Sequence, residues 1–247
     1  ICIFLVFAFG LYFFQTKEHR LASVARFAWY SLLAGASSAV LLIPEIIVLS
    51  ASGSAEDGFP KQIEFYFHII AELGRGATTA TSYLGNDHWP NLYAGAFCLL
   101  LVWLYVLNRR ISWKEKLPRL WMLGFFLVSF ANKQLDFIWH GMHFPQALPG
   151  RQSFLYIFMI LTMGFATVRK WKGTKLWHIV LSTVGAMALL LASGIFGDED
   201  VTEPMSLLIT ALFISVYGIC LILIKLTRQQ PRMALFYFVF WIAIAEL

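Results

Sequence analysis

Long apolar runs dominate this chain and decide what it can fold into. Residues 205–224, MSLLITALFISVYGICLILI, contain no charged side chain. They match the roughly 20 apolar residues that a helix needs to cross a bilayer. Comparable runs recur along the sequence, at 1–14, 27–49, 90–107, 118–134, 152–168, 176–196, 205–226 and 233–247. We therefore predict an all-α, polytopic transmembrane helix bundle of about eight spans, of which the first and last are truncated.

The composition supports a membrane protein. Hydrophobic residues make up 59% of the chain and charged residues 13%, whereas a soluble domain carries roughly a quarter charged residues. No initiator Met and no basic stretch precede the first apolar run, so no signal peptide is predicted. We expect 1–247 to be a single transmembrane domain from a longer protein. The cysteines lie within apolar runs without ligand-like spacing, which argues against zinc and disulfide frameworks.

Basic residues are distributed unevenly between the loops. Every second loop, at 15–26, 108–119, 169–175 and 225–232, is basic, and together these loops hold most of the 19 Lys and Arg residues. Because Lys and Arg are enriched in cytoplasmic loops, we predict that these loops are cytoplasmic. Their charges are dispersed over short loops, so we expect neither nucleic acid as a partner nor a nucleotide-binding domain. The alternate loops, including 50–89 and 135–151, are predicted on the outer face.

Loop 50–89 contains two stretches of interest. KQIEFYFHIIAEL, residues 61–73, predicts a short helix lying at the membrane interface. Its Glu64, His68 and Glu72 follow at spacings of four, which a solvated polar face explains. The later stretch YLGNDHWPN places Asp87 and His88 at the outer membrane edge. These two residues are candidates for acid–base or metal chemistry and for substrate contacts, and a simple turn is the alternative.

The segment DFIWHGMHFPQALPGRQSF, residues 136–154, concentrates ionisable side chains in loop 135–151. If the preceding helix continues to residue 143, Asp136, His140 and His143 lie on one face by their i, i+4 and i+7 spacing. They are candidates for proton transfer, with satisfied structural histidines as the alternative. The HxxH pair lacks the further ligand of catalytic zinc motifs, so no metal or other cofactor is predicted, and a divalent metal is the weaker alternative.

Arg151 opens an apolar run on the predicted outer face, where basic residues are otherwise avoided. A guanidinium at a helix N-terminus is well suited to binding phosphate. Snorkelling to lipid headgroups is the alternative. Asn132 and Lys133 are also candidates, because polar groups near the end of a span are costly without a partner.

Two blocks of the sequence resemble a known family. WPNLYAGAFCLLLVWLYVLNRRISWKEK, residues 89–116, and SFANKQLDFIWHGMHFPQALPGRQSFLYIF, residues 129–158, are similar in order and spacing to motifs of the YfhO family of bacterial multispanning membrane proteins. The resemblance covers roughly 1–247, with the clear motifs within 88–160. One departure is PGRQSF, where the family pattern has an aromatic residue beside the arginine.

The resemblance implies a glycosyltransferase of the GT-C kind. Such an enzyme moves a sugar from a polyprenyl-phosphate carrier to a cell-envelope polymer, such as a teichoic acid, on the outer face of the bacterial cytoplasmic membrane. It also implies that the catalytic aspartate lies before Ile1. In that setting Arg151 and Lys133 would hold the phosphate and Trp139 would stack on the sugar. Asp136, His140 and His143 would orient hydroxyls or move protons.

Two other functions fit the same residues. A non-catalytic transporter or flippase of lipid-linked glycans also needs an external arginine and aromatic side chains. A structural membrane scaffold is the third possibility. Charged residues or broken helices at mid-span would favour transport. In this sequence the ionisable groups lie at the predicted outer rim, which favours chemistry at the membrane surface.

Overall fold

The computed structural model describes residues 6, 8–10, 12, 20–51, 58–78, 80, 88–144, 149–197, 203–227 and 229–246. Within these ranges the regular structure is helical, and the β pairing is confined to one isolated bridge between Phe65 and Asn132. The predicted all-α class is therefore confirmed. Asp87 and most of the predicted first span, 1–14, lie outside the described residues.

The predicted spans 176–196 and 205–226 agree with helices to within one residue, whereas the helices over 27–49 and 118–134 begin seven and five residues earlier than predicted. In chain order they are α2 Arg20–Ser50, the 3₁₀ helix η2 Ala71–Gly76, α3 Ala96–Leu107, α4 Trp113–Ala131, α5 Lys133–Trp139, α6 Ser153–Arg169, the 3₁₀ helix η3 Trp171–Gly173, α7 Leu176–Phe196, α8 Pro204–Leu226 and α9 Gln229–Glu246. Helix α3 begins six residues later than the run 90–107 suggests, because Gly95 has a φ of 91° and ends the extended segment before it. Glycine adopts that conformation at little cost.

The helices differ in how they meet the membrane. Three have the length and apolarity of a full span, Arg20–Val48 within α2, Leu176–Phe196 and Pro204–Leu226, among the residues that the structure describes. Helix α3 has only 12 residues, or about 18 Å. Its Leu100 and Leu104 are fully buried. A short helix with irregular backbone at its end is stable at membrane depth where other protein surrounds it.

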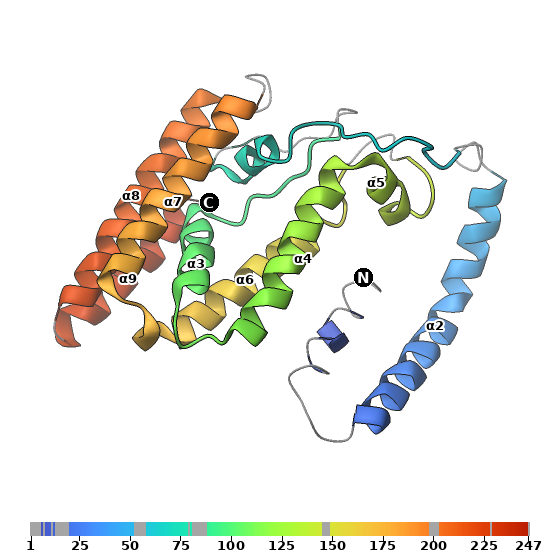
Figure 1. Cartoon of the computed structure of the whole chain (residues 1–247), viewed down its shortest axis with the longest axis horizontal. Helices are drawn as coiled ribbons and strands as arrows, with labels where there is room; N and C mark the ends of the chain where they lie inside the picture. Colours follow the sequence, from blue (N-terminus) through green and yellow to red (C-terminus); the bar gives the residue numbers. More distant parts are fainter. Residues whose placement is uncertain are drawn as a thin grey trace.

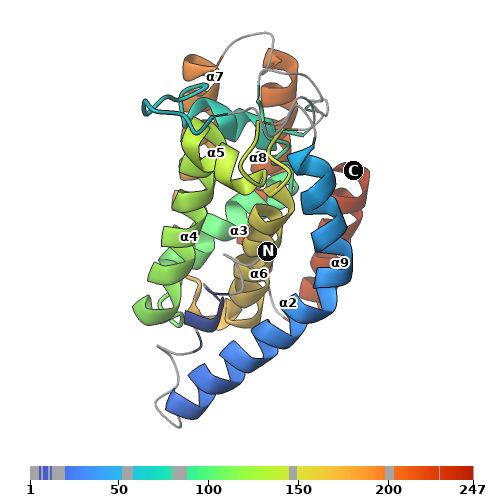
Figure 2. The ribbon, with the colours of Figure 1, turned by 90° about the vertical axis from the view of Figure 1, so that its right-hand side faces the viewer.

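The core of the bundle lies around α3. Helices α6, α7 and α8 pack against α3, α4 packs against α6, and α9 packs against α8. Figure 1 shows these helices together and α2 standing apart from them. After a quarter turn, α4 and α6 are seen running side by side (Figure 2). The apolar window of α2 is not buried by other parts of the described chain.

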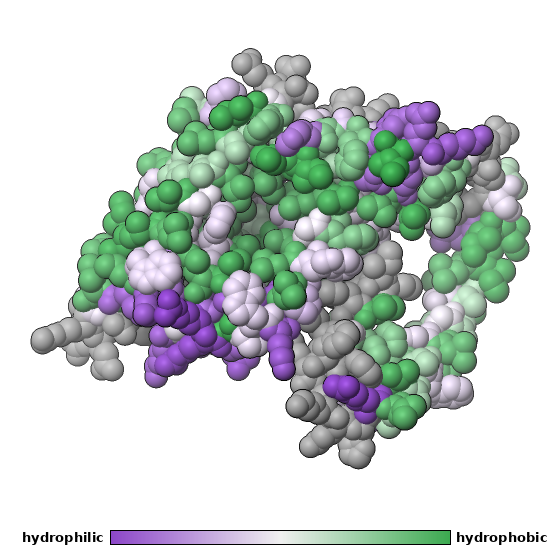
Figure 3. Space-filling view, in the orientation of Figure 1, coloured by the Kyte–Doolittle hydropathy of each residue, from purple (hydrophilic) through white to green (hydrophobic). Residues whose placement is uncertain are grey.

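Polar residues gather at the two ends of this bundle. Hydrophilic side chains lie along two opposite edges, with a hydrophobic band between them (Figure 3). One end carries loops 108–112 and 170–175, which we call the basic face. The other carries residues 59–78, 88–95, 132–144 and 149–152, which we call the motif face. The separation is that expected of a protein whose middle lies in hydrocarbon.

A buried carboxylate joins α9 to its neighbours. Glu246 accepts hydrogen bonds from the hydroxyls of Tyr217 at 2.7 Å, Thr78 at 3.1 Å and Tyr93 at 3.1 Å. It also accepts one from the backbone N–H of Ala96, the first residue of α3. The positive end of the α3 dipole favours a carboxylate at this position.

Candidate functional site on the motif face

A break between α4 and α5 shapes the motif face. Asn132 interrupts the helix with a ψ of 125°, and its side chain accepts a hydrogen bond from the Leu135 N–H at 3.0 Å. Asparagine is a preferred N-cap because it satisfies an amide that the new helix leaves free. The structure therefore accounts for this predicted site residue as the N-cap of α5.

Backbone groups exposed at this break bind a segment from the distant loop 50–89. The Tyr66 N–H donates to the Ala131 carbonyl at 2.9 Å, and the Lys133 N–H donates to the Glu64 carbonyl at 3.1 Å. The predicted interfacial helix over 61–73 is wrong for this reason. Residues 61–70 are not helical, and only η2 follows. Pairing with the break satisfies backbone groups that a surface helix would satisfy internally.

Asp136 is the centre of a buried polar cluster. It is 2% exposed. Its Oδ2 accepts a hydrogen bond from the Tyr66 hydroxyl at 3.1 Å and lies 3.4 Å from Nδ1 of His88. Its Oδ1 lies 3.1 Å from Nδ1 of His140, one turn further along the chain. We call Tyr66, His88, Asp136 and His140 the Asp136 cluster. Its members lie up to 74 positions apart in the sequence. Within the cluster, the sequence predicted a contact only between Asp136 and His140.

Two ring stacks hold the loop segments of this cluster together. The Tyr66 ring stacks on His88 with 4.0 Å between centroids, and the adjacent Phe67 stacks on Trp89 at 4.0 Å. His88 has a φ of 62°, which is costly for a residue with a side chain. The stacks and the Asp136 contact together favour this strained backbone over a relaxed turn.

The charge states in the cluster follow from its contacts. Burial opposes ionisation of Asp136, but hydrogen bonds and positive charge from His140 and His88 outweigh it and lower the pKa of the carboxyl. Burial, followed by the Asp136 charge and hydrogen bond, raises the pKa of Tyr66 far above its usual value. Asp136 is therefore a carboxylate at neutral pH, and Tyr66 remains a protonated donor.

The tautomer of His140 is fixed by two acceptors. Its Nδ1 lies 3.1 Å from Oδ1 and 2.9 Å from the backbone oxygen of Asp136. Both atoms accept hydrogen bonds, so Nδ1 carries a proton. In the unprotonated form of the ring, Nε2 keeps a free lone pair. That Nε2 is buried without a hydrogen-bond partner in the described chain. A histidine oriented by a carboxylate, with its second nitrogen free, has the geometry of a general base.

The other predicted residues are less closely gathered. Helix α5 ends at Trp139, and Gly141 and Met142 follow with φ of 76° and 67°. The predicted common helical face therefore fails for His143. Trp139 packs against Phe126 in the core, with 5.8 Å between ring centroids.

Lys133 and Arg151, the two predicted phosphate contacts, differ in whether a neighbouring acid offsets their positive charge. Lys133 forms an ion pair with Glu64 at 2.5 Å, which offsets its positive charge. Arg151 is exposed just before α6. Arg151 is therefore the better placed of the two to receive a phosphate.

Gly150 fixes the approach of the chain to Arg151. It has a φ of 62°, and an added Cβ would lie 2.9 Å from Cβ of Pro90, two residues after His88. We expect Gly150→Ala to lower the free energy of unfolding by about 1–3 kcal/mol through strain and overpacking. Thermal unfolding in detergent measures this. Gly124→Ala is the control, because nothing lies within 4 Å of its added Cβ. Equal effects of the two substitutions would contradict the packing role of Gly150.

Glu72 is a buried acid, although its spacing in the sequence was explained by a solvated polar face. Its side chain is 0% exposed, and neither carboxyl oxygen has a hydrogen-bond partner among the described residues. Burial raises the pKa of Glu72 to about 9. The carboxyl group is therefore protonated at neutral pH. The sequence pattern, with polar residues four positions apart, gave no sign that this one turns inward.

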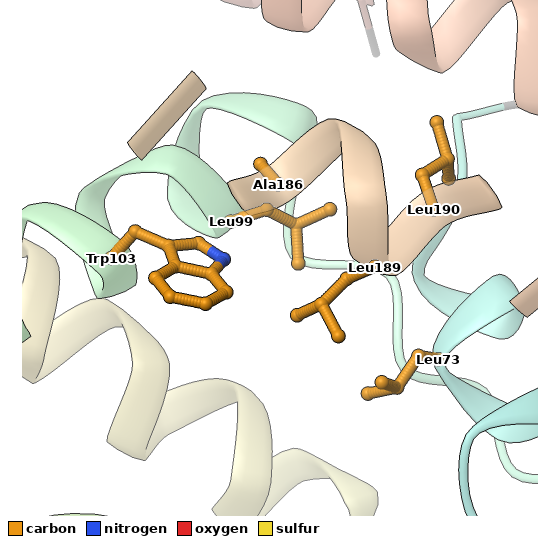
Figure 4. A pocket seen from close by; sticks show the side chains of 6 residues that line it. All are labelled: Leu73, Leu99, Trp103, Ala186, Leu189 and Leu190. Carbon is orange, nitrogen blue, oxygen red and sulfur yellow. The ribbon is translucent and has the colours of Figure 1, made fainter. Parts of the chain in front are cut away.

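Two further features bear on the kind of ligand. No group of three or more His, Cys, Asp and Glu side chains arranged to hold a metal occurs in the described ranges. A hollow of about 320 Å³ lies between η2, α3 and α7, lined by Leu73, Leu99, Trp103, Ala186, Leu189 and Leu190 (Figure 4). Its lining offers no donors or acceptors for a sugar apart from the Trp103 indole N–H. The Asp136 cluster is the better candidate for polar chemistry.

Comparison with sequence families matches residues 1–247 to the family described as bacterial membrane protein YfhO. The chain belongs to the YfhO family. Neither the curated proteins nor the solved structures include a significant match to it. The Asp136 cluster and the exposed Arg151 thus lie on one end of a YfhO-family membrane protein, at the ends of its apolar helices.

Proposed function

We propose that this YfhO-family protein is a GT-C-type glycosyltransferase. It moves a sugar from a polyprenyl-phosphate carrier to a cell-envelope polymer on the outer face of the cytoplasmic membrane. The observation that carries the proposal is the Asp136 cluster, because it sets a carboxylate-oriented histidine at the membrane edge. The exposed Arg151 at the start of α6 supports it.

The transfer assigns a separate task to each group. An acceptor hydroxyl oxygen bonds to the anomeric carbon of the sugar and loses its proton, while the carrier phosphate leaves with the electron pair of the broken bond. Arg151 stabilises the charge that develops on this phosphate. His140 accepts or relays a proton at Nε2, and Asp136 orients His140 and stabilises its positive charge. His143, His88 and Asp87 are proposed to contact sugar hydroxyls.

Arg151→Ala tests the phosphate contact. We expect transfer of labelled sugar from a polyprenyl-phosphate donor to fall by roughly 100-fold or more, as for other lost transition-state donors. The assay uses the full-length protein in vesicles at equal protein levels. Arg169→Ala is the matched control, because Arg169 ends the same helix on the opposite face. Transfer by Arg151→Ala within twofold of wild type would rule out the phosphate role.

The same vesicles separate transfer from transport. If wild-type protein moves the lipid-linked sugar across the bilayer but attaches none to an envelope polymer, the transporter alternative replaces the enzyme. Sugar attached to polymer without any change in the distribution of carrier between leaflets supports the transferase.

A further inference from the structure

Two loops on the basic face are locked into one unit. The side chain of Asn108, which is fully buried, donates to the Lys170 carbonyl at 3.0 Å and accepts from the Arg110 N–H at 2.9 Å. Gly173 fits tightly beneath it, since an added Cβ would lie 2.2 Å from Oδ1 of Asn108. The α3–α4 loop therefore holds the segment that leads into α7 in a fixed position.

This fixed segment contains two buried polar groups without partners. His178 is 0% exposed, and its Nδ1 accepts a hydrogen bond from the Lys175 N–H at 3.1 Å. The proton of the neutral ring is therefore on Nε2, which has no partner in the described part of the chain. The hydroxyl of Thr174, on a residue 1% exposed, also lacks one. Unpaired buried donors are costly, and a bound anion is one arrangement that satisfies them.

The charges around these donors are positive. Those that act on His178 belong to Arg109, Lys175, Lys116 and Lys225. None of the four takes part in an ion pair within the described ranges. The nearby acid Glu115 is shared by Arg119 and Lys170, each at 2.9 Å. The N-terminus of α7, a helix of 21 residues, adds further positive potential.

Positive charge from four elements thus acts on His178, beside two donors that lack partners. Arg109 follows α3, Lys116 belongs to α4, Lys175 precedes α7, and Lys225 lies near the end of α8. Lys116 already donates to the Val106 carbonyl at 2.6 Å. Arg109, Lys175 and Lys225 carry the remaining charges, and Nζ of Lys225 lies 5.9 Å from the centre of the Trp171 ring. Phosphate suits such a set, because it accepts several hydrogen bonds and carries negative charge.

We propose that Thr174, His178, Arg109, Lys175 and Lys225, here called the His178 site, bind the phosphate of an anionic phospholipid headgroup. The site lies at the end of spanning helices, where headgroups of the adjacent leaflet are concentrated. It is on the opposite face from the Asp136 cluster and does not depend on the proposed transfer. Bound lipid would link the α3–α4 loop, α7 and α8 on the basic face.

Lipid-dependent thermal stabilisation of the full-length protein in neutral detergent tests the site. We expect phosphatidylglycerol to raise the melting temperature, and phosphatidylcholine, whose choline offsets the phosphate charge, to have little effect. Inorganic phosphate forms a third arm. Equal stabilisation by inorganic phosphate would overturn the headgroup assignment in favour of a soluble phosphate compound. No response to phosphatidylglycerol would overturn the site itself.

Two sets of variants distinguish this site from general attraction between basic loops and acidic lipid. In the double variant Arg109→Ala/Lys225→Ala, the phosphatidylglycerol concentration needed for half of the stabilisation is expected to rise at least tenfold. Lys114→Ala/Lys172→Ala is the matched control, since it removes two exposed charges from the same face, and a change below twofold is expected. Equal weakening by both pairs would overturn the proposal.

Thr174→Val separates binding from folding. Removing an unpartnered hydroxyl is expected to leave the melting temperature of the lipid-free protein unchanged or higher. The same change is expected to weaken the lipid response several-fold. A lower lipid-free melting temperature with an unchanged lipid response would assign Thr174 a purely structural role and contradict its place in the site.

Discussion

Asp136→Ala is expected to lower the free energy of unfolding by about 3–5 kcal/mol, because it removes one side of a buried charged network and leaves the other side unpaired. The Tyr66 hydroxyl and Nδ1 of His140 lose their acceptors, and His88 loses the carboxylate that lies 3.4 Å from its Nδ1. For a chain of this size the melting temperature would fall by roughly 6–20 °C. Thermal unfolding followed by tryptophan fluorescence measures the effect.

Tyr66→Phe is the graded control for this experiment. It removes one donor and leaves the carboxylate paired with both histidines, so a loss of about 1 kcal/mol is expected.

The Asp136→Ala effect should also shrink in acid. The pKa of Asp136 is lower in the folded protein than its value near 3.8 in the unfolded chain. The ionised carboxylate therefore stabilises the fold at pH values above 3.8, and this contribution is lost as the pH falls through the folded-state pKa. A change below 1 kcal/mol for Asp136→Ala at neutral pH would contradict the cluster's structural role.

Glu72→Gln is expected to stabilise the protein, and increasingly so at alkaline pH. The folded state raises the pKa of Glu72 from 4.5 to about 9. It therefore holds a proton that the unfolded chain releases. The contribution of Glu72 to stability is greatest below pH 4.5 and falls by about 1.4 kcal/mol per pH unit up to the folded-state pKa. Glutamine keeps the shape of the neutral acid without this dependence.

Melting temperatures of wild type and Glu72→Gln at pH 5, 6.5 and 8 test the dependence. The difference should be small at pH 5 and reach several kcal/mol at pH 8. Glu203→Gln is the control, since Glu203 is exposed and its substitution should give no pH-dependent gain. A Glu72→Gln effect that is the same at all three values would show that the buried carboxyl does not take up a proton on folding.

The fold was largely predictable because hydrophobic length is a local property. The run 176–196 has the bounds of α7, and the run 205–226 differs from α8 by one residue. Helices α2 and α4 begin seven and five residues earlier than predicted. Helix α3 begins six residues later than predicted, because only the packing around it allows extended residues to precede a helix of 12 residues. The interfacial helix failed for a similar reason. The partners of Glu64 and Tyr66 lie near residue 132, and no local pattern specifies such pairing.

The candidate site was predictable only where helical spacing applied. Asp136 and His140 are four residues apart on a helix and its cap, so their contact follows from sequence. Tyr66 and His88 reach the same carboxylate from loops, through stacking and backbone pairing that depend on the whole fold. His143 was misplaced because Gly141 and Met142 turn the chain away from the helix. The HG pair of residues 140–141 was the available sign of that turn.

The carboxylate at the end of α9 has a consequence for the register of that helix. Apolar helices can slide or rotate against one another at modest cost, because one hydrocarbon contact replaces another. A slip of α9 by one residue would rotate Glu246 by about 100° and shift it by about 1.5 Å. It would lose its four donors from Thr78, Tyr93, Ala96 and Tyr217 at once. The hydrogen bonds of this one acid therefore fix the position of α9 along its neighbours, which apolar contacts alone would not do.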